Sequence, residues 1–271
     1  MNAMQAIQMV VFDWAGTTVD YGSSAPAEVF DRVFTGAGLR LTRGEINRPM
    51  GMEKRAHIRE LLSCESGSRQ WREAYGRPWT EEDVERLYRE FEETLRQVVA
   101  EYSAPIPGVV EAVAKLRERG LRIGPTTGYT SEIMELVIPR ARALGYEADC
   151  VVTPDLTGAG RPTPFMLYEC MRRMTVYPPA AVVKVGDTVV DVQEGKNAGA
   201  WSVGILTGSN LLGLTREEYL AAQPEELEAR KSEAADRYRE AGADLVIDSI
   251  RDLPAAIDEL NRRMARKEAE L

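Results

Sequence analysis

Two acidic motifs in the sequence could hold a divalent metal ion. Asp13 directly follows the apolar run at residues 7–12, and Asp187 follows the apolar run at residues 181–185, with Asp191 four residues further along the chain. Two carboxylates from different strands, with a backbone carbonyl nearby, suit Mg2+, because this ion prefers oxygen ligands. A metal ion placed there would neutralise a phosphoryl group and let the other oxygen of Asp13 attack its phosphorus atom.

Further polar residues follow two other apolar runs. Thr127 and Gly128 come after the run at residues 121–123, and Arg161 comes after the run at residues 150–152. Thr127 and the backbone N–H groups at the start of the next helix would bind phosphoryl oxygens, and Arg161 would add a charged clamp. The order of these residues along the chain favours a site for phosphoryl chemistry.

Each of these residues also has a purely structural interpretation. Asp13 alone could form a turn or cap a helix, Asp191 could be a carboxylate at the start of a helix, and Arg161 could be a surface residue. Only their combination after successive strands indicates a functional site.

A second group of reactive residues lies around position 54. Lys54 falls in the first turn of an expected helix, where the positive end of the helix dipole disfavours its charged form. A neutral amine can condense with a carbonyl group. His57, the only histidine of the chain, follows three residues later and so lies on the same face of that helix. From the spacing alone, a solvated Lys54 and a partly buried structural His57 are the simpler interpretations.

The elements that must position these residues alternate between strands and helices. Short apolar runs indicate buried strands, and helical patterns separate most of them. This alternation predicts a parallel sheet with helices on both faces, in which ligands bind beyond the carboxyl ends of the strands. The expected strands lie at residues 7–12, 121–123, 150–152, 181–185, 201–205 and 245–247. The expected helices include residues 109–116, residues 165–174 opened by Thr163 and Pro164, and a solvated helix at residues 224–239.

Residues 24–102 differ from the rest because they contain no strand-like run. Thr80 and Asp83 open a long amphipathic helix, residues 42–45 form a capping box for another, and a further helix can begin near Gly51. We therefore expect an inserted helical domain. The expected division is an α/β core formed by residues 1–22 and 103–271, and a helical domain formed by residues 23–102.

The composition is that of an ordinary globular protein. Of the 271 residues, 44% are apolar and 28% are charged, which excludes a fibrous or disordered chain. No apolar run approaches the roughly 18 to 20 residues that span a bilayer, and residues 1–4 do not resemble the start of a signal peptide. The net charge of -9 repels nucleic acid and anionic membranes. We therefore expect a cytoplasmic protein with no nucleic-acid or membrane partner, in which Cys64, Cys150 and Cys170 are inert thiols.

The order of these motifs resembles that of the haloacid dehalogenase superfamily. The matching positions are Asp13, Thr127, Arg161 and residues 186–191. The resemblance implies a Rossmann-like parallel core with an inserted α-helical cap domain. Phosphatases of this superfamily usually carry a second aspartate two residues after the nucleophile as a general acid, whereas this chain has Ala15. Ala15 can offer its carbonyl oxygen to the metal but cannot donate a proton, so the leaving group must be activated in another way.

Within that superfamily the chain closely resembles the phosphonatases. The positions that carry this resemblance are residues 13–17, 50–51, 127–129, 160–162 and 184–188, with Lys54 and His57. It implies hydrolysis of phosphonoacetaldehyde, a small-molecule substrate, to acetaldehyde and phosphate, and a homodimer formed through the cap domains. It makes Lys54 the imine-forming lysine and Asp13 the nucleophile that becomes an aspartyl-phosphate.

The resemblance also assigns supporting roles. The residues expected to bind Mg2+ are Asp13, Ala15 and Asp187. Those expected to bind substrate or support the site are Thr127, Gly128, Arg161, Met50, Gly51, His57, Tyr129 and Asp191, of which Met50, His57 and Tyr129 would assist proton movement around the imine. Ser23 departs from the family, because relatives have a cysteine in the loop after the first strand.

Two other functions use the same residue types. A phosphate monoester phosphatase of the same fold would use Asp13, Thr127, Arg161 and Asp187, but it would need an acid at position 15. A phospho-aspartate signalling module also pairs an aspartate with Mg2+, but such modules are about half this length and have no inserted domain.

Overall fold

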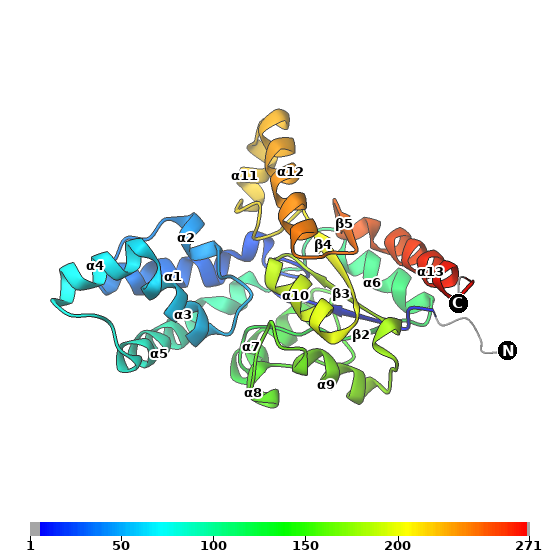
Figure 1. Cartoon of the computed structure of the whole chain (residues 1–271), viewed down its shortest axis with the longest axis horizontal. Coiled ribbons are helices and arrows are strands. Elements are labelled where there is room, and N and C mark those ends of the chain that lie inside the picture. Colours follow the sequence, from blue (N-terminus) through cyan, green and yellow to red (C-terminus); the bar gives the residue numbers. More distant parts are fainter. Residues whose placement is uncertain (1–5, 270–271) are drawn as a thin grey trace.

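A five-stranded sheet forms the centre of the computed structural model, which describes residues 6–269 (Figure 1). The strand order is β2-β1-β3-β4-β5, and every neighbouring pair is parallel, as predicted. The strands are β1 (Met9–Phe12), β2 (Arg122–Ile123), β3 (Val182–Gly186), β4 (Trp201–Ile205) and β5 (Leu245–Ile247). β1 and β3 are buried along their whole length, as in central strands that helices cover on both faces. Residues 1–4, to which the signal-peptide expectation refers, lie outside the described residues.

Helices cover both faces of the sheet. Three of them are α6 (Val109–Glu118), α9 (Phe165–Met174) and α13 (Leu253–Ala269). Met9 and Val11 of β1 pack in a hydrophobic cluster with α9, whereas Val10 and Phe12 pack in a larger cluster with α6 and α13. Because successive side chains of a strand point to opposite faces, the two clusters lie on opposite sides of the sheet.

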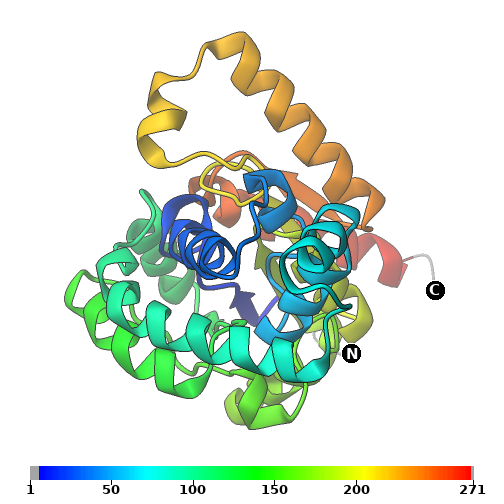
Figure 2. The same ribbon diagram turned by 90° about the vertical axis from the view of Figure 1, so that its left-hand side faces the viewer.

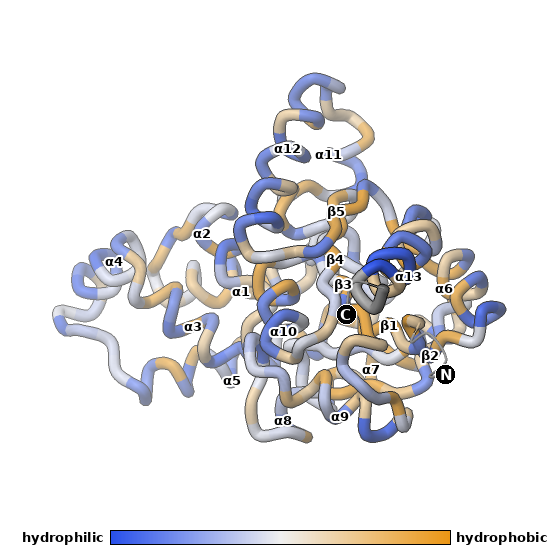
Figure 3. The backbone as a smooth tube through the Cα atoms, turned by 45° about the vertical axis from the view of Figure 1, so that its right-hand side comes forward, coloured by the Kyte–Doolittle hydropathy of each residue, from blue (hydrophilic) through white to orange (hydrophobic). Residues whose placement is uncertain are grey.

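Two further helices form an arm that projects from the core (Figures 1 and 2). They are α11 (Arg216–Ala221) and α12 (Pro224–Glu240). Figure 3 shows α12 as largely hydrophilic, and only Ala234, Ala235 and Tyr238 of this helix are buried, which confirms the predicted solvated helix. Among the described residues, no helix is both long and apolar enough to cross a bilayer. The other helices of this part are α7 (Ser131–Ala143), α8 (Pro154–Thr157) and α10 (Val189–Ala198), with 3-10 helices η3 (Pro179–Ala181) and η4 (Ile250–Asp252).

The helical insertion, which we define as residues 24–102, stands beside the carboxyl ends of the strands and contains no strand (Figures 1 and 2). Its helices are α1 (Ser24–Gly36), α2 (Arg43–Asn47), α3 (Lys54–Ser63), α4 (Glu65–Tyr75), α5 (Glu81–Val98) and the 3-10 helix η2 (Val99–Tyr102), preceded by η1 (Tyr21–Ser23). Both predicted capping boxes are present, from Thr42 to Glu45 and from Thr80 to Asp83. α5 packs against α1 and α3. The division into two domains stays a prediction.

The backbone connection between the insertion and the core, which we call the neck, consists of two chain segments that run side by side. Val19 and Pro105 form an antiparallel bridge. Ile106 donates a backbone hydrogen bond of 2.9 Å to Thr18, and Asp20 donates one of 3.3 Å to Ala104. The chain therefore enters and leaves the insertion at neighbouring points.

Two local predictions were wrong. Residues 150–152 form only a single bridge, between Val152 and Thr126, because Pro154 starts helix α8 directly afterwards. Pro164 is the N-cap of α9 rather than its first helical residue. The helix expected near Gly51, with Lys54 in its first turn, is confirmed: it begins at Lys54, because Gly51 has a φ of +90°, which is a left-handed and non-helical conformation.

Candidate active site

Asp13 lies at the carboxyl end of β1 and faces Arg161. Its Oδ1 atom accepts hydrogen bonds of 2.6 Å from the backbone N–H of Trp14 and 2.5 Å from the Arg161 guanidinium. No hydrogen bond from the described residues reaches the other oxygen, Oδ2. Asp13 therefore has one oxygen held in place and one oxygen free for chemistry.

Asp13, Asp187 and Asp191 form a buried cluster of carboxylates. One oxygen from each lies within 4.8 Å of the others. Asp187 accepts hydrogen bonds from the Thr17 hydroxyl at 2.8 Å and from the Asn210 backbone at 2.9 Å, and no described cation pairs with it. Burial, then the charges of Asp13 and Asp191, raise the pKa of Asp187 well above its ordinary value.

The donor set of this cluster fits a hard divalent cation. The donors are oxygen atoms, and a positive charge beside Asp187 would offset the repulsion that raises its pKa. Asp187 is thus the carboxylate of this cluster that has no cationic partner among the described residues.

Asp191 differs because two cations already neutralise it. Its side chain accepts hydrogen bonds from Arg161 at 2.6 Å and from the Thr188 hydroxyl at 2.5 Å, and it pairs with Lys184 at 3.0 Å. Burial alone would raise the pKa of Asp191, but Arg161 and Lys184 hold it below its ordinary value. Asp191 therefore orients the guanidinium, and it also forms the capping box of α10 with Thr188.

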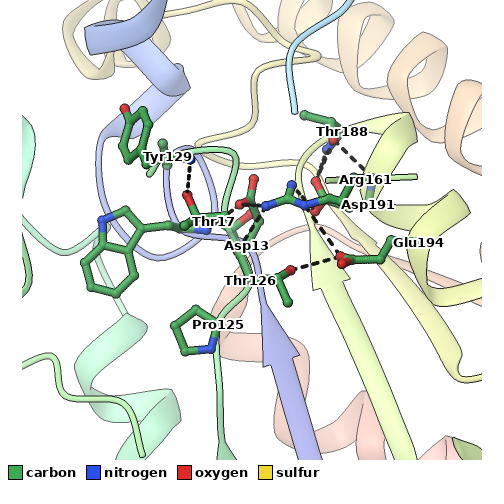
Figure 4. A network of polar contacts seen from close by, with 12 residues as sticks. Asp13, Thr17, Pro125, Thr126, Tyr129, Arg161, Thr188, Asp191 and Glu194 are labelled. Atoms are coloured by element: carbon green, nitrogen blue, oxygen red, sulfur yellow. Dashed lines mark hydrogen bonds and ion pairs between the residues drawn. The ribbon is translucent and has the colours of Figure 1, made fainter. Parts of the chain in front are cut away.

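Arg161 is fully enclosed by this polar network (Figure 4). It bridges Asp13 and Asp191, donates a hydrogen bond of 3.0 Å to the backbone of Thr126, and lies 3.5 Å from Glu194. The interpretation of Arg161 as a surface residue is wrong. The Arg161 guanidinium therefore points at Asp13, where the predicted phosphoryl group would be bound.

Lys184 lies in a stretch that carries the family resemblance, but no role was predicted from the sequence for it or for Glu194. Lys184 lies within β3, is buried, and pairs with Glu194 of α10 at 3.0 Å. Both side chains contact the hydroxyl of Thr126, at 2.7 Å and 2.9 Å. The sequence signal that could have found them was a lysine inside an apolar run, because a buried ammonium group requires a partner of opposite charge.

Lys54 opens α3 and is only 4% exposed, so the interpretation as a solvated lysine is wrong. Its Nζ atom lies 5.5 Å, 5.7 Å and 5.9 Å from the ring centroids of Tyr129, Phe30 and Phe91. Among the described residues it has no ion-pair partner within 4.0 Å. Burial lowers the pKa of Lys54 to about 8, although the negative charge of Asp13 acts in the opposite direction. The amine is therefore available in its neutral form near physiological pH.

The loop before α3 brings Lys54 to the strand ends by close contact with the core. A Cβ atom on Gly51 would lie 2.6 Å from the Thr188 hydroxyl. A Cβ atom on Gly128 would lie 3.0 Å from the carbonyl oxygen of Met52 and 3.7 Å from the Nζ atom of Lys54. The absence of side chains at both glycines lets the insertion approach the core this closely.

His57 and Tyr129 have unpaired polar atoms near Lys54. His57 is fully buried, its Nε2 atom lies 2.9 Å from the carbonyl oxygen of Ile46, and its Nδ1 atom has no partner among the described residues. Burial, then the charge of Lys54, lower the pKa of His57 well below its ordinary value, so its ring is neutral. Burial raises the pKa of the Tyr129 hydroxyl, which also has no described partner.

The remaining predicted residues also lie in this region. Met50 is 3% exposed in the loop before α3. The Thr127 hydroxyl accepts a hydrogen bond of 3.2 Å from the backbone of Tyr129. The Ser23 hydroxyl lies 3.1 Å from the carbonyl oxygen of Ala15 and 3.3 Å from Asp187, so it touches two of the predicted metal ligands.

Comparison with known proteins identifies close relatives. Residues 7–199 match the family model described as haloacid dehalogenase-like hydrolase. The chain is 47% identical over 261 residues to a phosphonoacetaldehyde hydrolase of Bacteroides fragilis, which covers 96% of this chain and 99% of that protein. It is 45% identical over 257 residues to a phosphonoacetaldehyde hydrolase of Bacillus cytotoxicus, with coverage of 95% and 97%. A crystal structure of a phosphonoacetaldehyde hydrolase-like protein from Oleispira antarctica superposes with a TM-score of 0.94 at 36% identity, covering 98% of this chain and 97% of the other.

Proposed function

The chain belongs to the phosphonoacetaldehyde hydrolase family of haloacid dehalogenase-like hydrolases, and we propose that it hydrolyses phosphonoacetaldehyde to acetaldehyde and phosphate through an imine at Lys54 and an aspartyl-phosphate at Asp13. The observation that carries the proposal is the buried Lys54 amine with its pKa lowered to about 8, held against the strand ends where Asp13 lies.

The C–P bond explains why an amine is needed. Cleavage of this bond has no leaving oxygen to protonate, and direct attack on phosphorus would expel an unstable carbanion. An iminium formed between Lys54 and the aldehyde accepts the electron pair of the C–P bond and becomes an enamine. An acid at position 15 would have no alkoxide to protonate, which agrees with the presence of Ala15.

Asp13 supplies the nucleophile for the phosphoryl group. Its free oxygen forms a bond to phosphorus while the C–P bond breaks, which gives an aspartyl-phosphate and the enamine. Water then hydrolyses the aspartyl-phosphate to phosphate. The enamine gains a proton at carbon, and water releases acetaldehyde from Lys54. Arg161 and Thr127 bind the phosphoryl oxygens.

Mg2+ would be held by Asp13, Asp187 and the carbonyl oxygen of Ala15. When bound, it neutralises the negative charge of the phosphonate that otherwise repels Asp13. His57 and Tyr129 supply unpaired polar atoms beside Lys54 that can hydrogen-bond to the reacting groups during the imine stage. A homodimer formed through the helical insertion stays a prediction from family resemblance, and a cytoplasmic location stays a prediction from the sequence.

A phosphate monoester phosphatase of the same fold is the competing function. It would use the same carboxylates and Arg161, but Ala15 cannot protonate an alkoxide leaving group. Phosphate release from phosphonoacetaldehyde and from a panel of phosphate esters separates the two functions. Preferential hydrolysis of an ester would contradict the proposal, and a phosphorylated Asp13 that does not turn over would favour a signalling module instead.

The pH dependence of imine formation should report the lowered pKa of Lys54. Only the neutral amine attacks the aldehyde, so the rate of reductive labelling by acetaldehyde and cyanoborohydride should rise from pH 6 and level off above about pH 8. Acetaldehyde has no phosphonate group to titrate, which keeps the profile simple. A rate that continues to rise tenfold per pH unit up to pH 10 would show an ordinary lysine pKa.

Replacing Asp187 with asparagine should weaken the effect of Mg2+. We expect the Mg2+ concentration for half-maximal phosphate release to rise at least about tenfold, because one negative charge beside the metal is lost. The melting temperature of the metal-free protein should not fall, because the substitution also removes repulsion among buried carboxylates. Asp236→Asn, at an exposed position of α12, is the matched control. An unchanged Mg2+ requirement, or full activity after chelation, would contradict the metal assignment.

A further inference from the structure

A pocket lined by arginines lies between the helical insertion, the core and the arm. It has a volume of about 520 Å3, and we call it the arginine pocket. Its walls are α2 and Arg48 of the insertion, residues 210–213 of the loop after β4, and α12 of the arm. The proposed reactive residues Asp13, Lys54 and Arg161 do not line it, so the arginine pocket is separate from the candidate active site.

The lining of the arginine pocket is positively charged, although the chain as a whole has a net charge of -9. Its one acidic residue is Glu233, and its four arginines are Arg43, Arg48, Arg230 and Arg237. Arg43 and Arg230 form ion pairs with residues that do not line the pocket, whereas no ion pair of the described residues involves Arg48 or Arg237. Two guanidinium groups are therefore available for an anionic ligand, and their forked donors suit the oxygens of a phosphate group.

These charges come from both sides of the boundary between insertion and core. Arg43 and Arg48 belong to the insertion, whereas Arg230 and Arg237 belong to the arm. Like charges brought into one pocket repel each other, so the observed position of the insertion costs free energy unless an anion lies between them. A dianion in the pocket would attract both sides and so stabilise this position.

Two asparagines add unpaired hydrogen-bonding groups of opposite kinds. Asn210 lines the pocket, is 2% exposed, and its side-chain Nδ2 atom has no partner among the described residues. Asn47 also lines it, and its buried Oδ1 atom likewise has no described partner. A buried polar group without a partner is unfavourable, so a ligand that both accepts and donates hydrogen bonds suits the pocket. Hydrogen phosphate is a dianion that accepts through its unprotonated oxygens and donates through its P–OH group.

We propose that the arginine pocket binds hydrogen phosphate, and that the bound ion holds the insertion against the core. Arg48 and Arg237 donate hydrogen bonds to its oxygens from opposite sides of the boundary. The ion also lies next to the candidate active site, because the backbone N–H of Asn210 donates a hydrogen bond of 2.9 Å to Asp187. This binding does not depend on an imine at Lys54, so it can be tested separately from the proposed function.

Labelling of wild-type protein with phenylglyoxal tests the proposal at single residues. The reagent modifies guanidinium groups, and peptide mapping gives the labelling rate of each arginine. Added inorganic phosphate, at constant ionic strength, should slow the labelling of Arg48 and Arg237 in parallel, by at least about fivefold at saturation, because one bound ion covers both groups. Arg40 is exposed and does not line the pocket, so its rate should not change.

Arg237→Gln and Arg239→Gln form a matched pair of variants, because both positions lie in the last turns of α12 but only Arg237 lines the pocket. The readout is the phosphate concentration that gives half-maximal protection of Arg48. We expect this concentration to rise at least about tenfold in Arg237→Gln and to stay unchanged in Arg239→Gln. Phosphate bound only in the candidate active site would protect Arg48 equally in both variants. The melting temperature checks folding, and Arg48→Gln, with protection measured at Arg237, gives the same comparison from the other side.

Three results would overturn the proposal. The first is labelling of Arg48 and Arg237 that phosphate does not slow, and the second is protection of Arg48 that Arg237→Gln leaves unchanged. The third is equal protection by sulfate, which has no proton to donate to Asn47, because equal protection would show only a general attraction of anions to a positive surface. Each of these results leaves the proposed function intact.

Discussion

Lys54→Arg is expected to abolish cleavage of the C–P bond, with a loss of at least about a thousandfold in rate, while the protein stays folded. An imine requires a primary amine that can lose its proton. A guanidinium keeps its proton at every usable pH and is a very poor nucleophile. If Lys54 instead bound the phosphonate by charge, arginine would replace it at least partly. The two explanations therefore predict opposite results for one substitution.

Phosphate release from phosphonoacetaldehyde measures this effect, and Lys115→Arg, at an exposed position of α6, is the control. Peptide mapping of wild type after acetaldehyde and borohydride should find an added mass of about 28 on Lys54. Lys184 is also buried but is paired with Asp191 and Glu194, so it should remain unlabelled. An adduct on another lysine, or substantial cleavage by Lys54→Arg, would show that the imine assignment is wrong.

Asp13→Ala is expected to abolish phosphate release to a similar extent but to leave imine formation intact. The substitution removes the nucleophile and a predicted metal ligand. Arg161 keeps its ion pair with Asp191 at 2.6 Å, so the buried guanidinium is not left without a counter-charge and the fold should survive.

The check on Asp13→Ala has two parts. Phosphate release should disappear, and reductive labelling of Lys54 by acetaldehyde should continue. Retention of even a tenth of the wild-type phosphate release would exclude Asp13 as the nucleophile. Loss of labelling as well would show that the variant disturbs the whole site, and the melting temperature distinguishes that case from local damage.

The positions of Asp13 and Asp187 could be predicted from the sequence because they follow apolar runs. Such runs predict buried strands, and the carboxyl ends of parallel strands meet at one edge of a sheet. The burial of Lys54 could not be predicted, because its aromatic neighbours Phe30, Phe91 and Tyr129 come from three separate parts of the chain. Spacing along one helix carries no information about such contacts.

Two other features, the structure of residues 150–152 and the pairing of Lys184, could not be predicted for local reasons. The run at residues 150–152 has the composition of a strand, but the following proline starts a helix and leaves only one bridge. The pairing of Lys184 with Glu194 depends on how α10 packs against β3. Its sequence signal was one charged residue in an apolar run, which predicts a buried partner but not which residue provides it.

Because the chain enters and leaves the insertion at the neck, the insertion and the core contribute separate parts of the proposed chemistry. Two short segments, held together at Val19 and Pro105, carry the backbone connection, and the insertion adds no strand to the described sheet. A different helical segment at the same place in the chain would leave Asp13 and Arg161 unchanged but would remove Lys54, which we propose forms the electron-accepting iminium. In the proposed mechanism, the kind of bond that is broken therefore depends on the helical insertion. Replacement of the insertion during evolution would change the substrate while the sheet stays the same.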